Sequence, residues 1–263
     1  MKKSLLFFLL AFSLVVGSCS SGEEQISPQT NEALSLSRAE VQSYQSESGD
    51  ETPTTSLFTS GDMITVVGAA DDDVIFILSE DGEWRTLSEY SWMESPQTVY
   101  AYYGTNTSIS DGDQMPDLLV AEIECNGVIP QNGILSFAGD RAFHHATALV
   151  EVKITGWNEY VEPTVTLKNL HSIISLSNTG KYIFDTKYLY GVNLELISST
   201  NGVLTYRGRV PAGDSMETNI NSGYSLMINT LNAMDYLLDD SLIPTYFEAG
   251  KSFLFSLAFD YTM

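Results

Sequence analysis

The chain has 263 residues, of which 43% are hydrophobic, so it can form one large or two modest folded domains. Its 34 Asp and Glu residues outnumber its 12 Lys and Arg residues, which gives a formal net charge of −22. A surface with this charge repels a phosphate backbone. Composition therefore excludes a disordered chain and disfavours nucleic acid as a partner.

The first 19 residues have the order of a bacterial export signal. Lys2 and Lys3 precede an apolar run from Leu5 to Val16, which is shorter than the roughly 20 residues of a membrane-spanning helix. Gly17 and Ser18 then stand before Cys19. This order predicts a signal peptide over residues 1–18, with the mature chain beginning at Cys19.

The residues around Cys19 resemble the lipobox of bacterial lipoproteins, which implies a palmitate-type lipid on the Cys19 thiol. Glu23 and Glu24 follow closely, and an acidic patch there resembles the surface-export signal of Bacteroidetes lipoproteins. We therefore expect a lipid anchor on the outer face of the cell outer membrane. The alternative is a plain signal peptide, with Cys19 incidental. If Cys19 carries lipid, Cys125 has no disulfide partner and packs as a small apolar side chain.

Residues 19–55 are rich in Ser, Glu, Gln and Thr, which favours a solvated tether, part of which could become a strand. Beyond the tether, runs of β-branched and aromatic residues recur between turn signals, including hairpin turns at Asp81-Gly82 and Asn201-Gly202. Residues 232–238 could form a short helix. The runs predict strands at residues 63–67, 74–78, 83–87, 99–103, 118–125, 134–137, 150–154, 192–196, 203–206, 224–228 and 253–259.

This pattern predicts an all-β fold. Ten to twelve strands are more than one small sandwich usually holds, which favours two tandem antiparallel β-sandwich domains. We place the N-terminal sandwich at residues 56–145 and the C-terminal sandwich at residues 146–263.

No residue pattern indicates catalysis or a bound metal. His144 and His145 are adjacent, so in a strand they point to opposite faces and cannot share one zinc ion, while His171 is isolated. Acidic clusters at 71–73, 111–113 and 239–240 are interpreted as solvated turns, with calcium binding as the open alternative. We expect no enzyme activity, no catalytic or metal-ligating residues and no cofactor except the lipid on Cys19.

Aromatic residues gather between Trp84 and Tyr103. Trp84, Trp92 and Tyr102 could stack on a sugar, although alternating aromatics in strands more often form core and cross-strand pairs. The core interpretation is favoured. The alternative function that follows from the ligand interpretation is a monomeric surface lipoprotein that binds glycans or other ligands.

Several segments together resemble the fimbrillin-like lipoprotein family of Bacteroidetes, related to major and minor fimbrial subunits. They are the lipobox, residues 58–64, 99–103, 113–114, 117–121, 135–137 and 143–150. The resemblance implies two transthyretin-like sandwich domains and a structural or adhesive role in a fimbria, or pilus. It also implies partners: other subunits or further copies of the chain joined by strand exchange, with ligands on host or bacterial surfaces.

In that family a trypsin-like protease cuts after an Arg, and a neighbouring subunit's strand replaces the strand that leaves. Arg38 is the first Arg here, so the resemblance places processing at Arg38, with an ordinary tether residue as the alternative. The sequence ends directly after the run at 253–259, whereas the family usually continues into a further strand. This departure leads us to expect an anchor or cap as an alternative to a shaft subunit.

Overall fold

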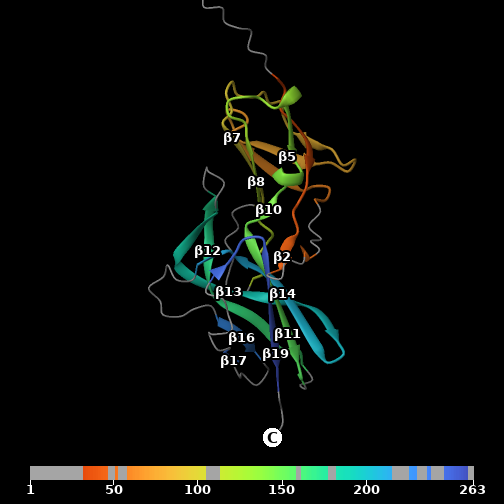
Figure 1. Ribbon diagram of the computed structural model, residues 1–263, viewed down its shortest axis with the longest axis vertical. Coiled ribbons are helices and arrows are strands. Elements are labelled where there is room, and N and C mark those ends of the chain that lie inside the picture. Colours follow the sequence, from red (N-terminus) through yellow and green to blue (C-terminus); the bar gives the residue numbers. More distant parts are fainter. Residues whose placement is uncertain are drawn as a thin grey trace, which may run out of the picture. The chain divides into compact units, whose positions relative to one another are not determined.

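The alternating runs of the sequence form a series of short strands in a computed structural model of the protein (Figure 1). The structure describes residues 32–46, 51–52, 58–104, 113–157, 161–176, 182–214, 225–229, 236–237 and 246–259, all within a compact unit from Asn31 to Met263. Among these residues no helix is long and apolar enough to cross a membrane.

A six-stranded antiparallel sheet forms from the first long set of runs, in the order β10-β8-β7-β4-β5-β6. Its inner face is apolar because every second residue points inward, as Ile64 and Val66 do in β4. Gly82 turns the chain between β5 and β6 with φ of 84°. The strands are β4 (Met63–Val67), β5 (Val74–Leu78), β6 (Trp84–Thr86), β7 (Thr98–Tyr103), β8 (Leu119–Glu124) and β10 (His144–His145).

A second, two-stranded sheet packs on that inner face. It consists of β1 (Ser35–Ala39) and β9 (Ile134–Phe137), which run parallel to each other. Leu36, Leu135 and Phe137 belong to the same buried cluster as Ile64 and other inner residues of the six-stranded sheet. The two sheets therefore make a sandwich in which β1 supplies one of the two covering strands.

The remaining strands form a nine-stranded mixed sheet in the order β17-β16-β12-β13-β14-β11-β19-β2-β3. Its buried side chains form one cluster in which Val165 and Leu167 join Val150 and Phe253, so distant parts of the sheet pack together. The strands are β2 (Tyr44–Ser46), β3 (Glu51–Thr52), β11 (Thr147–Thr155), β12 (Thr164–Leu176), β13 (Tyr182–Thr200), β14 (Val203–Pro211), β16 (Ser225–Asn229), β17 (Tyr236–Leu237) and β19 (Lys251–Ala258), and a separate pair is β15 (Gly213–Asp214) with β18 (Tyr246–Phe247).

The all-β prediction is confirmed, and each predicted strand overlaps an observed one. Within the expected tether, residues 32–46 contain strands, which the sequence left open, and Leu34, Leu36 and Tyr44 are buried there. One expectation is wrong. Tyr236–Leu237, inside the expected helix, is a strand that pairs with β16. The division into domains at 56–145 and 146–263 stays a prediction.

Tyr206 makes the nine-stranded sheet less stable at alkaline pH. Its ring is buried in β14, and its hydroxyl donates a 2.6 Å hydrogen bond to the carbonyl of Pro163. Burial, with a smaller effect from the Glu162 charge, raises its pKa from 10.0 to about 12. Since the folded state holds the proton more tightly, this stabilisation is complete below pH 10 and is lost as the pH rises toward 12.

We therefore expect Tyr206→Phe to weaken the loss of stability between pH 10 and 12, while lowering stability at pH 7 by about 1 kcal/mol through the missing hydrogen bond. Urea unfolding at a series of pH values measures both effects. An unchanged alkaline slope in the variant would contradict the assignment.

Candidate strand-exchange site

The N-terminal segment, residues 32–46, contacts two different sheets. Its first part contains β1 in the two-stranded sheet, and its last part is β2 in the nine-stranded sheet. In Figure 1 the orange chain carries β2 to the neighbourhood of β10 and β14. The sequence hides this placement because the partners of the segment lie about 100 and 200 residues further along the chain.

The first part of the segment is held mainly by its backbone. β1 pairs with β9, the amide of Leu34 donates to the Tyr90 carbonyl at 2.8 Å, and the amide of Trp92 donates to the Glu32 carbonyl at 3.0 Å. Two buried side chains, Leu34 and Leu36, reach the core. Burial of two apolar side chains stabilises the strand by on the order of 3–6 kcal/mol, which is a modest contribution.

Gly133 lets the chain before β1 approach closely. Its φ is 66°, and a Cβ added there would lie 2.5 Å from the Ala33 carbonyl oxygen and 3.2 Å from Nε1 of Trp92. A side chain at this position would push the segment away from the loop before β9. Glycine is therefore needed for the close contact as well as for the turn.

Arg38 lies at an irregular point of the β1–β9 pair. Leu36 pairs with Leu135 and Arg38 with Ser136, so Ser37 is an extra residue on the β1 side. The side chain of Arg38 is 67% exposed and forms an ion pair with Glu40. Exposed pairs of this kind contribute about 0–1 kcal/mol, so a protease that binds the Arg38 side chain meets little resistance from it.

The last part of the segment is held by more contacts. The amides of Glu40 and Gln42 donate to the carbonyls of Phe137 and Phe143, and the amide of Phe143 donates back to the Glu40 carbonyl. The Glu40 carboxylate accepts a 3.0 Å hydrogen bond from the amide of Gly139. The backbone amide of Gln45 donates to the Gly250 carbonyl, and the side-chain oxygen of Gln45 accepts from Lys251 Nζ at 3.0 Å.

Tyr44 joins the segment to a buried polar cluster of Asp117, His145, Thr147 and Arg209. The Tyr44 ring stacks on the imidazole of His145 at 3.7 Å, and its hydroxyl lies 2.8 Å from the Thr147 hydroxyl. Asp117 accepts from Nδ1 of His145 at 2.8 Å and pairs with Arg209 at 3.2 Å. Because a carboxylate only accepts, Nδ1 of His145 is the donor in this hydrogen bond.

Burial and the charge of Asp117 raise the pKa of Tyr44 above its ordinary value, so the hydroxyl keeps its proton further into the alkaline range. His145 is 1% exposed, and Thr147 is fully buried. The sequence marks this cluster only weakly, since Asp117 and Arg209 stand in no motif that sets them apart from the other charged residues. Its one available signal was the polar pair His144-His145 at the edge of an apolar run, of which one member has to face inward.

The predicted ligand aromatics are part of the core. Trp92 and Tyr102 are each 6% exposed, and Nε1 of Trp92 donates to the Gly133 carbonyl at 2.8 Å. Trp84 is half-buried and packs edge-on against Phe58, with ring centroids 5.4 Å apart. Since Trp92 and Tyr102 point into the protein, neither offers a face for a sugar in this structure.

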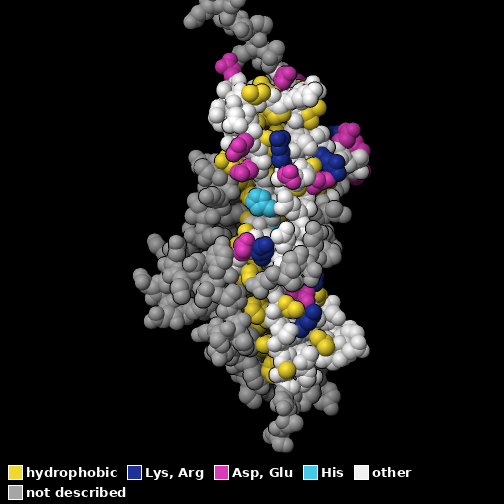
Figure 2. All heavy atoms as spheres, in the orientation of Figure 1, with side chains coloured by type: hydrophobic (Ala, Val, Ile, Leu, Met, Phe, Trp, Pro, Cys, Tyr) yellow, Lys and Arg dark blue, Asp and Glu magenta, His cyan; other side chains and the backbone are white. Residues whose placement is uncertain are grey.

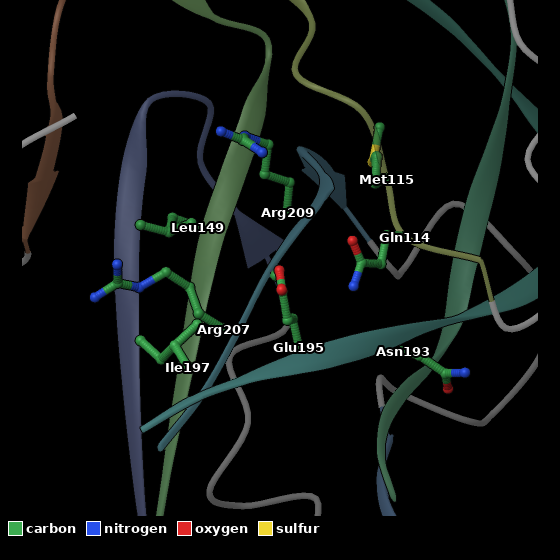
Figure 3. Close-up of a pocket in the computed structure, with 9 residues that line it drawn as sticks. Gln114, Met115, Leu149, Asn193, Glu195, Ile197, Arg207 and Arg209 are labelled. Atoms are coloured by element: carbon green, nitrogen blue, oxygen red, sulfur yellow. The ribbon is translucent and has the colours of Figure 1, made fainter. Parts of the chain in front are cut away.

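Two small cavities lie near charged side chains. One, of about 110 Å³, is open beside β13 and β14, where Glu195 points toward the space between Arg209 and Gln114 (Figure 3). The other, of about 190 Å³, is lined by Val41, Asp117 and Arg209 among others. Both are smaller than the roughly 300–1,000 Å³ of ordinary small-molecule sites. On the face drawn in Figure 2, acidic and basic side chains lie side by side.

The remaining candidate residues are the two cysteines and the acidic clusters. Cys19 lies outside the described residues, as do Asp239 and Asp240. Cys125 is buried, and burial raises the pKa of its thiol, which is the reverse of what a nucleophile needs. Asp71 to Asp73 are exposed, and within the described ranges no three His, Cys, Asp or Glu residues gather in an arrangement that could hold a metal ion.

The fold of this chain is similar to that of several proteins of known structure. A candidate cell adhesion protein of Bacteroides ovatus superposes with a TM-score of 0.58 at 14% identity, covering 89% of this chain and 94% of that one. A candidate cell adhesion protein of Bacteroides uniformis gives 0.55 at 17% identity, covering 88% and 95%. A third, of Bacteroides fragilis, gives 0.51 at 12% identity, covering 88% and 94%.

The chain therefore shares the all-β fold of these three proteins over most of its length. No model of a known protein family matches the sequence, and no curated protein does. At these identities the likeness concerns the fold, and the function has to be argued from the site.

Proposed function

We propose that this chain is a cell-surface lipoprotein, anchored at the outer membrane through lipid on Cys19, that acts in a fimbria assembled by exchange of β-strands. Its role there is that of a structural or adhesive subunit, or of the anchor or cap. Its partners are other subunits or further copies of itself, and ligands on host or bacterial surfaces. The shared fold with candidate cell adhesion proteins and the lipobox support this proposal.

One observation carries the strand-exchange part. Among the residues that the structure describes, β1 and β9 are the strands that cover the inner face of the six-stranded sheet, and β1 is held by a parallel backbone ladder and two leucines. If β1 leaves, a lane beside β9 opens, with unpaired backbone groups and vacant apolar sites. Another extended segment fills such a lane through main-chain hydrogen bonds and alternate side chains.

Arg38 is the proposed processing site. Its side chain is exposed, the extra residue Ser37 loosens the ladder beside it, and its ion pair with Glu40 is weak in solvent. A cut after Arg38 separates Leu34 and Leu36 from the rest of the protein. The lipid then belongs to the precursor, and an uncut chain remains attached as an anchor.

The test is to isolate the protein from the surface of bacteria that produce it, and to determine its N-terminus by mass spectrometry and its size on unheated gels. We expect chains beginning at Ala39 in heat-sensitive oligomers or in complexes with other surface proteins. Arg38→Ala should abolish the cut, while Arg85→Ala, another exposed Arg with acidic partners, should leave it intact. An intact chain from Cys19 through Arg38 that is always monomeric overturns the proposal.

A further inference from the structure

We infer that the N-terminal segment has two parts with different functions, divided after Arg38. Residues 32–38 form the exchangeable strand. Residues 39–46 form a latch that stays in the folded protein and limits the lane that opens. This inference rests on the proposed function and adds to it the boundary of the exchange site.

The contacts on the two sides of Arg38 differ in kind. Within residues 32–38, all of which the structure describes, the buried side chains are Leu34 and Leu36. The Ser37 hydroxyl donates a 3.0 Å hydrogen bond to the Leu135 carbonyl. These contacts reach β9, Tyr90, Ser91 and Trp92, all within the first sandwich.

On the C-terminal side, side-chain bonds are added to the backbone bonds. The backbone of Glu40 bonds to Phe137 and Phe143, and its carboxylate accepts from the amide of Gly139. The backbone amide of Gln45 donates to the Gly250 carbonyl, and its side-chain oxygen accepts from Lys251 Nζ. Tyr44, at 2% exposure, adds a stacked ring and a hydroxyl contact inside the Asp117–His145–Arg209 cluster. Pulling Tyr44 out would empty a ring-sized space and expose one face of a buried imidazole that is hydrogen-bonded to Asp117, both of which are unfavourable.

The latch also determines which strand can enter. With residues 39–46 in place, the lane beside β9 ends where Ala39 pairs with Phe137. An incoming segment then runs parallel to β9 and fills the sites of Leu34 and Leu36 with two apolar side chains two positions apart. It stops at the Arg38 position, because the new N-terminus at Ala39 occupies the next position beside β9.

Amide hydrogen exchange of the uncut protein tests the boundary without any processing. The amides of Leu34 and Trp92 report on the exchangeable strand, and those of Gln42 and Gln45 report on the latch. In the native protein we expect the first pair to exchange faster than the second. Leu36→Ala should speed the exchange of the first pair alone, by more than about tenfold.

Tyr44→Ala should have the opposite selectivity, with Gln42 and Gln45 accelerated more than about tenfold and Leu34 little changed. Tyr44→Phe keeps the stacked ring and should give a smaller effect on the same amides, and the amide of Val66 controls for global unfolding. Equal acceleration of both pairs by either variant, or faster exchange of Gln45 than of Leu34 in the native protein, overturns the latch. Failure of surface processing at Arg38 would instead overturn the proposed function and leave this exchange pattern intact.

Discussion

Asp117→Asn is expected to lower the free energy of unfolding by about 2–3 kcal/mol, a large fraction of a typical total. The carboxylate is 11% exposed and contacts His145 at 2.8 Å and Arg209 at 3.2 Å. The amide can still accept from His145, but its NH₂ group then faces the guanidinium of Arg209. The Arg209 side chain, 32% exposed, loses the carboxylate charge beside it, and solvent offsets part of that loss.

Urea unfolding measures this loss as a shift of the midpoint at constant slope. Asp72→Asn is the matched control, because Asp72 is exposed in an acidic turn and should change stability by less than about 0.5 kcal/mol. If the Asp117 variant lost no more than the control, the cluster would not stabilise the fold. Arg209→Met separates the two partners, since it removes one charge and leaves the His145 contact in place.

Phe143→Ala is expected to destabilise the protein by about 3–5 kcal/mol. The ring is fully buried and contacts Phe58 and Phe137 at centroid distances of 5.4 and 5.3 Å. The backbone of residue 143 can still pair with Glu40 and Gln42 in the variant, so the loss measures the contribution of the ring. Thermal unfolding followed by circular dichroism measures the change.

Phe143→Leu is the control for this variant, since a bulky apolar side chain fills most of the space and should cost less than about 1.5 kcal/mol. Similar losses in the Leu and Ala variants would show that the shape of the aromatic cluster matters more than the volume it fills.

The sequence was most informative where strands have one buried and one exposed face. Val150, Val152 and Ile154 alternate with charged residues, and this pattern predicted β11. Separate runs predicted the strands at Val203–Pro211 and Lys251–Ala258. Turn residues with positive φ, such as Asn201 and Gly202, fixed the hairpin between β13 and β14. These signals are local, so they identify strands without naming the partners of each strand.

The candidate site was harder to predict because it consists of non-local pairs. The parallel β1–β9 pairing joins residues about 100 positions apart, and the alternation Leu34-Ser35-Leu36-Ser37 is too short to mark a strand within a stretch rich in Ser and Glu. Arg38 came from a family resemblance. Asp117, Tyr44 and Arg209 carried no pattern, since a buried charge is visible only when its counter-charge is placed beside it.

The pairing of β2 with β19 imposes an order of events on folding. Gln45 cannot reach Lys251 until a stretch of 206 residues has been made. Until then residues 44–46 lack this partner strand, whereas β1 can already pair with β9. The last part of the segment is therefore completed late in folding, because contacts between residues distant in the sequence form slowly.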